Sequence, residues 1–267
     1  MEVIIQPDGE TAAWLAARII ARELRRDPYI TLGLATGATM ERVYRWLVQW
    51  HREEGLDFSL CHTFNLDEYV GLSANDPRSY HQYMNRHLFS QVNIDLRDTH
   101  LPDGMAVDLE MECRNYEALI KKFGGIDLQL LGLGQDGHVG FNEPLSAFQS
   151  RTRVKALTPQ TLEQNARFFG GKENVPRRAI TMGVGTILEA RRCLLLVTGA
   201  EKAEIVARAV EGPVTAMISA TALQWHPRCT VIVDEPAAAR LQGREYYQWI
   251  FQNEPEWDEF RRKDAGR

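Results

Sequence analysis

The sequence has only four cysteines among its 267 residues, and none of them forms a Cys-x-x-Cys pair. That shortage excludes the common zinc and thiol-redox motifs, and it is typical of reduced thiols in a cytoplasmic protein. No segment approaches the roughly 18 consecutive apolar residues of a membrane helix, so we expect no membrane partner. The first residues, Met1 to Pro7, are too few and too polar to be a signal peptide. The cysteines are Cys61, Cys113, Cys193 and Cys229.

The sequence also lacks an excess of positive charge. Its 31 Lys and Arg residues face 36 Asp and Glu residues, which gives a formal net charge of −5. Because nucleic acids and anionic membranes select basic surfaces, we expect neither as a partner. An anionic small substrate would therefore need a local basic pocket.

Short apolar segments alternate with amphipathic segments, which predicts strands alternating with helices. This order indicates an α/β fold, with residues 1–267 forming a single-domain, open, mainly parallel Rossmann-like sheet that has helices on both faces. The periodicity weakens after Pro144, and we expect a mobile, lid-like excursion at about residues 157–180. The expected strands are residues 3–5, 29–35, 60–66, 128–133, 179–184, 193–197 and 230–233. The expected helices are residues 11–24, 40–50 (capped by Thr39), 79–88, 107–123, 201–210, 214–224 and 241–262.

A turn crowded with acid–base groups follows the strand expected at residues 128–133. It places Asp136, His138 and Glu143 within eight residues, among glycines that let the backbone approach a ligand closely. An imidazole can exchange protons near neutral pH, and a carboxylate beside it can orient it. The stretch therefore predicts an active site, although an ordinary Gly-Asp-Gly turn is the simpler alternative.

Other polar residues directly follow expected strands. Thr36-Gly37-Ala38-Thr39 lies between a strand and a helix, where N–H groups and hydroxyls can bind phosphate, although an ordinary turn fits equally well. Asp67 is either a turn residue or a base whose pKa is raised by partial burial. Lys202 also follows a strand, and Arg167 of the lid-like excursion could clamp a bound phosphate, unless both are ordinary surface charges. Since the carboxyl ends of parallel strands share one edge, we expect these clusters to line one crevice.

The string Gly-Leu-Gly-Gln-Asp-Gly-His-Val-Gly-Phe-Asn-Glu-Pro at residues 132–144 resembles, almost letter for letter, the signature of the glucosamine-6-phosphate deaminases. Asn-Leu-Asp-Glu-Tyr at residues 65–69 and the Thr36–Thr39 loop resemble two further motifs of that family. In the loop, Ala38 replaces the usual Gly or Ser, and Met40 replaces the usual Pro. The resemblance spans about residues 30–236, and it implies conversion of glucosamine 6-phosphate and water to fructose 6-phosphate and ammonia.

The resemblance also implies a role for each site residue. Asp67 would be the base that moves a proton between C2 and C1 of the substrate. His138, supported by Asp136 and Glu143, would open the sugar ring. Because every step is a proton transfer, we expect no metal or other cofactor. The implied phosphate ligands are Thr36, Gly37, Ala38, Thr39, Arg167 and Lys202.

A second set of residues resembles a regulatory site. Ser146, Arg153 and Lys155 match the residues by which hexameric bacterial deaminases bind the activator N-acetylglucosamine 6-phosphate between subunits. Arg153 and Lys155 flank Val154, so both would project from one face of an extended segment. The resemblance thus implies a homo-oligomer such as a hexamer, and the alternative is a solvated basic strand.

Two other functions share part of this pattern. A 6-phosphogluconolactonase has a similar Gly-x-Asp-Gly-His core, but it usually continues with Thr-Ala-Ser where this sequence has Val139-Gly-Phe. A non-catalytic sugar-phosphate sensor would not need Asp67, His138 and Glu143 together. Such sensors usually add a DNA-binding domain, for which we expect no residues to remain.

Overall fold

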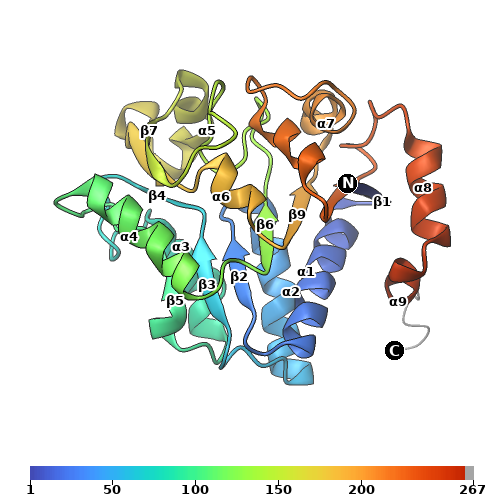
Figure 1. The fold of residues 1–267 in the computed structure, drawn as a ribbon, viewed down its shortest axis with the longest axis horizontal. Coiled ribbons are helices and arrows are strands. Elements are labelled where there is room, and N and C mark those ends of the chain that lie inside the picture. Colours follow the sequence, from blue (N-terminus) through green and yellow to red (C-terminus); the bar gives the residue numbers. More distant parts are fainter. Residues whose placement is uncertain (262–267) are drawn as a thin grey trace.

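The computed structural model describes residues 1–261 and is built on a seven-stranded sheet with the order β1-β10-β9-β6-β2-β3-β5 (Figure 1). All neighbouring strands in it are parallel, which confirms the predicted α/β class. No helix within these residues is long and apolar enough to cross a membrane. The strands are β1 (Glu2–Gln6), β2 (Thr31–Leu34), β3 (His62–Asn65), β5 (Thr99–His100), β6 (Leu128–Leu131), β9 (Arg192–Val197) and β10 (Cys229–Asp234).

The central strands are short apolar runs because helices cover them on both faces (Figure 1). Every residue of β6, β9 and β10 is buried. Helix α1 (Gly9–Arg26) packs beside α2 (Ala38–Glu54), and Tyr116 of α4 (Leu109–Lys122) contacts the Phe64 ring of β3. The remaining α-helices in the described part are α3 (Tyr80–His87), α5 (Pro159–Phe169), α6 (Val184–Leu188), α7 (Ala203–Val210), α8 (Arg244–Asn253) and α9 (Asp258–Arg261).

A second, three-stranded antiparallel sheet lies beyond the end of β3 (Figure 1). It consists of β4 (Asp67–Tyr69), β8 (Arg178–Thr181) and β7 (Arg153–Ala156), in the order β4-β8-β7. We predicted residues 179–184 as a strand of the main sheet, and that placement was wrong. An apolar run shows that a strand is buried, but it does not identify the strands that pair with it.

Several predicted boundaries also need correction. Thr39 does not cap α2, because the helix starts at Ala38 after Gly37, whose φ of +109° ends the preceding extended chain. Residues 214–224 do not form an α-helix, and the structure has a 3-10 helix, η5 (Ser219–Trp225), there instead. The predicted C-terminal helix is split into α8 and α9, and Arg262 lies outside the described residues.

The segment at residues 157–180 contains more regular structure than its weak periodicity indicated. It holds α5, which Thr158 caps by accepting a hydrogen bond from the Thr161 N–H. The helix thus has a capped start, and it ends at Gly170, which adopts the left-handed conformation common at helix ends. Its role as a mobile lid stays a prediction.

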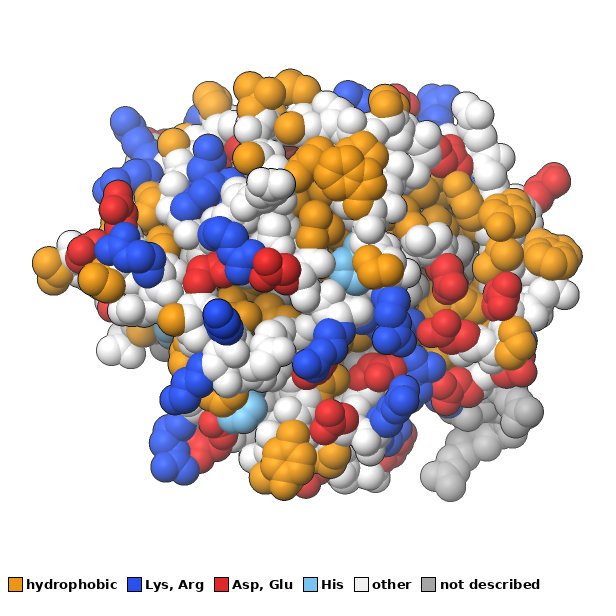
Figure 2. Space-filling model, viewed as in Figure 1, with side chains coloured by type: hydrophobic (Ala, Val, Ile, Leu, Met, Phe, Trp, Pro, Cys, Tyr) orange, Lys and Arg blue, Asp and Glu red, His pale blue; other side chains and the backbone are white. Residues whose placement is uncertain are grey.

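Charged side chains of both signs are interspersed on the face shown in Figure 2, without a large patch of one sign. This distribution agrees with the near balance of acidic and basic residues in the sequence. On this face, binding of an anionic ligand would therefore depend on individual cationic and N–H groups.

Candidate active site

The four polar clusters predicted from the sequence follow four adjacent strands. β9, β6, β2 and β3 are consecutive in the sheet. The strands that follow β2 in the chain lie on both of its sides, with β3 and β5 on one side and β6, β9 and β10 on the other. Ligands bind at such a switch point in open α/β sheets. The structure has a pocket of about 700 Å³ here. Its lining includes Thr36, Gly37, Ala38, Thr39, Asp67, His138, Arg167 and Lys202.

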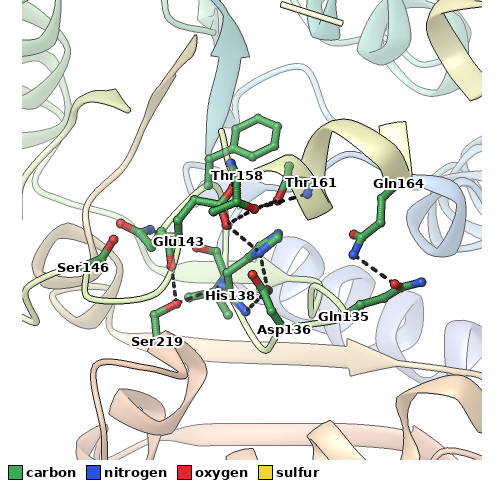
Figure 3. Close-up of polar contacts among 12 residues, drawn as sticks. Gln135, Asp136, His138, Glu143, Ser146, Thr158, Thr161, Gln164 and Ser219 are labelled. Atoms are coloured by element: carbon green, nitrogen blue, oxygen red, sulfur yellow. Dashed lines mark hydrogen bonds and ion pairs between the residues drawn. The ribbon is translucent and has the colours of Figure 1, made fainter. Parts of the chain in front are cut away.

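His138 lines this pocket and lies between two carboxylates (Figure 3). Its Nδ1 is 2.6 Å from Oδ1 of Asp136 and 3.5 Å from Oε2 of Glu143. The close approach to Asp136 is an ion-pair contact and not an aligned hydrogen bond. Burial alone would raise the pKa of Asp136, but the close contact with the His138 ring and the hydrogen bond from the His138 backbone N–H outweigh burial and lower that pKa. The pair is therefore suited to holding the imidazole in a fixed orientation.

Glu143 links this histidine to the first turn of α5. Its carboxylate is buried and accepts a hydrogen bond from the Thr158 N–H at 3.0 Å. The Thr158 hydroxyl also donates to Oε2 of Glu143 at 3.3 Å. Thr158 could not be identified from the sequence, because its contact depends on how α5 packs against the turn.

The turn that carries His138 is fixed from below by η5. The Ser219 hydroxyl accepts from the Val139 N–H at 3.2 Å and donates to the Asn142 carbonyl at 2.8 Å (Figure 3). Gly140 has a φ of +56°, and a Cβ there would lie 2.9 Å from the Thr181 hydroxyl. Glycine is thus required at this point of the turn, which sequence analysis recognised only in general terms.

Asp67 begins β4 and reaches the pocket from the sheet edge. Asp67 is 6% exposed, and burial, with a smaller contribution from the charge of Glu68, raises the pKa of its carboxyl group to about 8. A carboxyl group with such a pKa is a much stronger base than an ordinary aspartate. Glu68 faces the other way and accepts hydrogen bonds from the N–H groups of Tyr69, Tyr80 and His81.

Cationic and N–H groups occupy a different part of the pocket lining. The Lys202 ammonium donates to the Leu133 carbonyl at 2.8 Å, and burial lowers its pKa. Asp234, at the end of β10, accepts the Gly199 N–H with both oxygens and so holds the loop that carries Lys202. The sequence did not identify Asp234, because only the strand order shows that β10 lies beside β9.

Arg167 approaches the pocket from α5. Its guanidinium lies over the Phe168 ring at 4.6 Å, and the residue is exposed. Gln164, one turn earlier on α5, donates to the side chain of Gln135, in the turn before His138, at 3.0 Å (Figure 3). This direct contact joins α5 to the turn that carries His138, and the sequence did not reveal it.

The three predicted regulatory residues lie outside the lining of this pocket. Arg153 donates to the Ser146 hydroxyl at 3.0 Å and to Oδ1 of Asn142 at 2.9 Å. Lys155 lies two residues further along β7, so it shares a face of the strand with Arg153. Ser146 and Arg153 are thus brought together, and Arg153 also contacts Asn142, the residue directly before Glu143.

One group of side chains has the composition of a metal site. Within residues 1–261, Asp136, His138 and Glu143 are the only His, Cys, Asp or Glu cluster whose ligand atoms all lie within 4.8 Å of one another. The same three residues support proton transfer equally well, since an imidazole between two carboxylates can give up and regain a proton.

Comparison with known proteins gives consistent matches along most of the chain. The model of a family described as glucosamine-6-phosphate isomerases/6-phosphogluconolactonase matches residues 9–232. A glucosamine-6-phosphate deaminase from Arthrobacter sp. (strain FB24) is 48% identical over 257 residues, which cover 96% of this chain and 99% of the relative.

Solved structures agree with this result. One described as a monomeric glucosamine-6-phosphate deaminase is 45% identical with a TM-score of 0.89, covering 90% of this chain and 100% of that chain. The 6-phosphogluconolactonase from Trypanosoma cruzi is 19% identical with a TM-score of 0.74, covering 90% of this chain and 97% of that chain, and it shares only the fold. The chain therefore belongs to the family of glucosamine-6-phosphate isomerases and 6-phosphogluconolactonases.

Proposed function

We propose that this protein is a glucosamine-6-phosphate deaminase, which converts glucosamine 6-phosphate and water to fructose 6-phosphate and ammonia. The observation that carries the proposal is the joint placement of Asp67 and His138 in one pocket with Lys202 and the Thr36–Thr39 loop. A base, a proton shuttle and a phosphate site are the three elements that this reaction requires. The relatives at high identity and coverage bear the same name.

The phosphate group of the substrate binds at the start of α2. The first N–H groups of a helix have no partner within it, and they favour an anion. Thr36 and Thr39 add hydroxyl groups, Lys202 adds a charge from the β9 side, and Arg167 closes over the group from α5. The sugar then extends from the phosphate towards Asp67 and His138.

The reaction itself proceeds by proton transfers. His138, held by Asp136 and Glu143, moves a proton between O1 and O5 and opens the pyranose ring. Asp67 then removes the proton from C2 to give an enolamine and returns a proton to C1. Water attacks the resulting C2 iminium, and ammonia leaves. A base with a pKa of about 8 suits this work, because it is strong enough to take a carbon-bound proton and is still partly ionised near neutrality.

The decisive experiment is incubation of the purified protein with glucosamine 6-phosphate while ammonia and fructose 6-phosphate are both measured. We expect equimolar release of the two products without added metal or nucleotide. Complete loss of activity on exhaustive chelation, restored by one metal, would instead assign Asp136, His138 and Glu143 to a metal site. Hydrolysis of 6-phosphogluconolactone would support a lactonase, and tight binding of the sugar phosphate without turnover would support a sensor.

We further propose that Ser146, Arg153 and Lys155 form a second phosphate site for N-acetylglucosamine 6-phosphate in a homo-oligomer, with a hexamer as one form. The contact between Arg153 and Ser146 supports this site, whereas the solved relative at 45% identity is described as monomeric. A cytoplasmic location fits the four buried cysteines, all of which are free.

A further inference from the structure

Helix α3 touches the phosphate-binding loop through one tyrosine. The hydroxyl group of Tyr83 donates a hydrogen bond to the carbonyl oxygen of Gly37 at 2.8 Å. The two residues are 46 positions apart in the sequence, and both line the pocket. The Tyr83 ring is oriented by an edge-on contact with Tyr44 of α2, with 6.4 Å between the ring centres. The hydroxyl is therefore aimed at the loop by packing on the helix that the loop precedes.

Gly37 has few other restraints. Its φ is +109°, and a Cβ at this position would meet no atom within 4 Å, so no close packing surrounds that side of the residue. No side chain caps the start of α2 by a hydrogen bond. The Gly37 carbonyl also accepts the Met40 N–H at 2.9 Å, which closes the first turn of the helix. Within residues 1–261, Tyr83 supplies the only side-chain hydrogen bond to this carbonyl.

Fixing this carbonyl also fixes a donor for the ligand. Gly37 and Ala38 share a planar trans peptide, in which the C=O and the N–H point in opposite directions. A hydrogen bond that holds the Gly37 carbonyl on the α3 side therefore sets the direction of the Ala38 N–H. Ala38 is the first residue of α2 and lines the pocket, so its N–H is one of those that the helix cannot pair internally.

Hydrogen bonds to a buried carboxylate hold the start of helix α3, which carries Tyr83, in place. Its first two N–H groups, those of Tyr80 and His81, donate to the buried carboxylate of Glu68 at 3.1 Å each. Nδ1 of His81 lies 2.9 Å from the same carboxylate. Glu68 adjoins Asp67 in β4, so the helix that orients the phosphate loop is anchored on the strand that carries the proposed base.

We propose that Tyr83 is a positioning residue for phosphate binding: its hydroxyl holds the Gly37–Ala38 peptide in the orientation that presents the Ala38 N–H to a phosphate group. The ligand class is a phosphate monoester, and its identity as an amino-sugar phosphate rests on the proposed function. Tyr83 does not contact the reacting carbons in this account. Its removal should therefore weaken phosphate binding and leave the chemical step almost unchanged.

The test is Tyr83→Phe, which removes the hydroxyl and keeps the ring. A net hydrogen bond of about 0.5–1.5 kcal/mol corresponds to roughly a 2- to 10-fold change in affinity. We expect the Kd of inorganic phosphate and the KM of the sugar phosphate to rise together by that factor, with kcat changed less than about 2-fold. The matched control is Tyr247→Phe, which removes a hydroxyl bonded to Glu211 outside the pocket and should change neither constant.

A second measurement keeps the proposal testable if the variant is less stable. In the unaltered protein, the amide resonance of Ala38 should shift on titration with inorganic phosphate, and in Tyr83→Phe the shift should need a higher concentration. Unchanged phosphate affinity in folded Tyr83→Phe, or a fall in kcat alone, would overturn the proposal. If Tyr83→Phe weakens phosphate binding but the unaltered protein releases no ammonia, the proposed function is wrong and the role of Tyr83 in phosphate binding stands.

Discussion

The N–H of Thr158 donates to Oε1 of Glu143 at 3.0 Å, which joins the first turn of α5 to the carboxylate beside His138 (Figure 3). The hydroxyl of Thr158 has two tasks, because it caps α5 by accepting the Thr161 N–H and also approaches the second oxygen of Glu143. The stability of α5 and the position of the Glu143 carboxylate therefore both depend on Thr158. Since α5 also carries Arg167, the same helix connects the proposed phosphate ligand with the carboxylate beside His138.

Replacing Thr158 with valine should loosen α5 and raise KM. The change keeps the shape of the side chain but removes the cap, which is typically worth about 0.5–2 kcal/mol of helix stability. Hydrogen exchange should become faster at residues 160–169, and KM should rise several-fold as Arg167 is held less firmly. Thr152→Val, which removes a hydroxyl bonded to Glu117 elsewhere, serves as the control. Unchanged exchange in α5 together with unchanged KM would contradict the proposed connection.

Replacing Asp67 with asparagine should abolish turnover with little loss of substrate affinity. The amide has nearly the same shape as the carboxylate but cannot accept the C2 proton. Loss of a general base typically costs about 10²–10⁴-fold in rate. Steady-state kinetics and substrate titration of the variant would measure the two effects separately. A variant that kept more than a few per cent of kcat would show that another group is the base.

The pH dependence of the reaction should also report Asp67. Burial raises its pKa to about 8, and the base acts in its ionised form, so kcat/KM should rise as the pH increases through about 8. A phosphate monoester loses its second proton near a pKa of about 6, so its titration is separable from the rise of kcat/KM near pH 8. A profile that is already flat between pH 7 and 9 would mean that Asp67 ionises in the normal range for an aspartate.

The same pKa shift predicts the sign of a stability change. The pKa of Asp67 is raised from 3.8 to about 8, so between these values the folded state holds a proton that the unfolded state has lost. The contribution of this group to stability is thus complete below about pH 4 and is lost as the pH rises through 8. Asp67→Asn should consequently raise Tm most at pH 9 and least at pH 4. An equal Tm difference at both pH values would argue against a buried, ionising Asp67.

The grouping of the pocket residues follows from the sequence because it depends on a general property of parallel sheets. Thr36, Asp67, His138 and Lys202 each follow an apolar strand, and the carboxyl ends of parallel strands share one edge. That these residues lie close together can therefore be predicted without knowing the strand order. Asp234 shows the limit of that argument, since its contact with Gly199 depends on β10 lying directly beside β9.

The small antiparallel sheet was not predictable in the same way. β4 reads Asp-Glu-Tyr and β7 reads Arg-Val-Lys-Ala, so neither has the apolar run that indicates a buried strand. Both become strands because β8 lies between them and pairs with each. The hydrogen bond between Tyr83 and Gly37 likewise depends on the rotation of α3, which short-range sequence patterns do not set.

The last prediction concerns regulation through Arg153. Its guanidinium joins Ser146 to Asn142, and Asn142 precedes Glu143, so an anion bound at Arg153 would compete for contacts next to the carboxylate that supports His138. If N-acetylglucosamine 6-phosphate binds there and favours the closed pocket, substrate saturation should shift to lower concentrations in its presence. A coupling of about 1–3 kcal/mol corresponds to roughly a 5- to 150-fold change in affinity.

Substrate saturation curves with and without N-acetylglucosamine 6-phosphate measure this coupling directly. Arg153→Met should abolish the shift, because the variant loses the charge and the paired donors that recognise a phosphate. Arg97→Met, which removes a guanidinium that bonds to the nearby Asp95, should retain the shift. Superimposable curves for the unaltered protein would remove the regulatory site and leave Asp67 and His138 in their proposed roles, because neither depends on Arg153 for its place in the pocket.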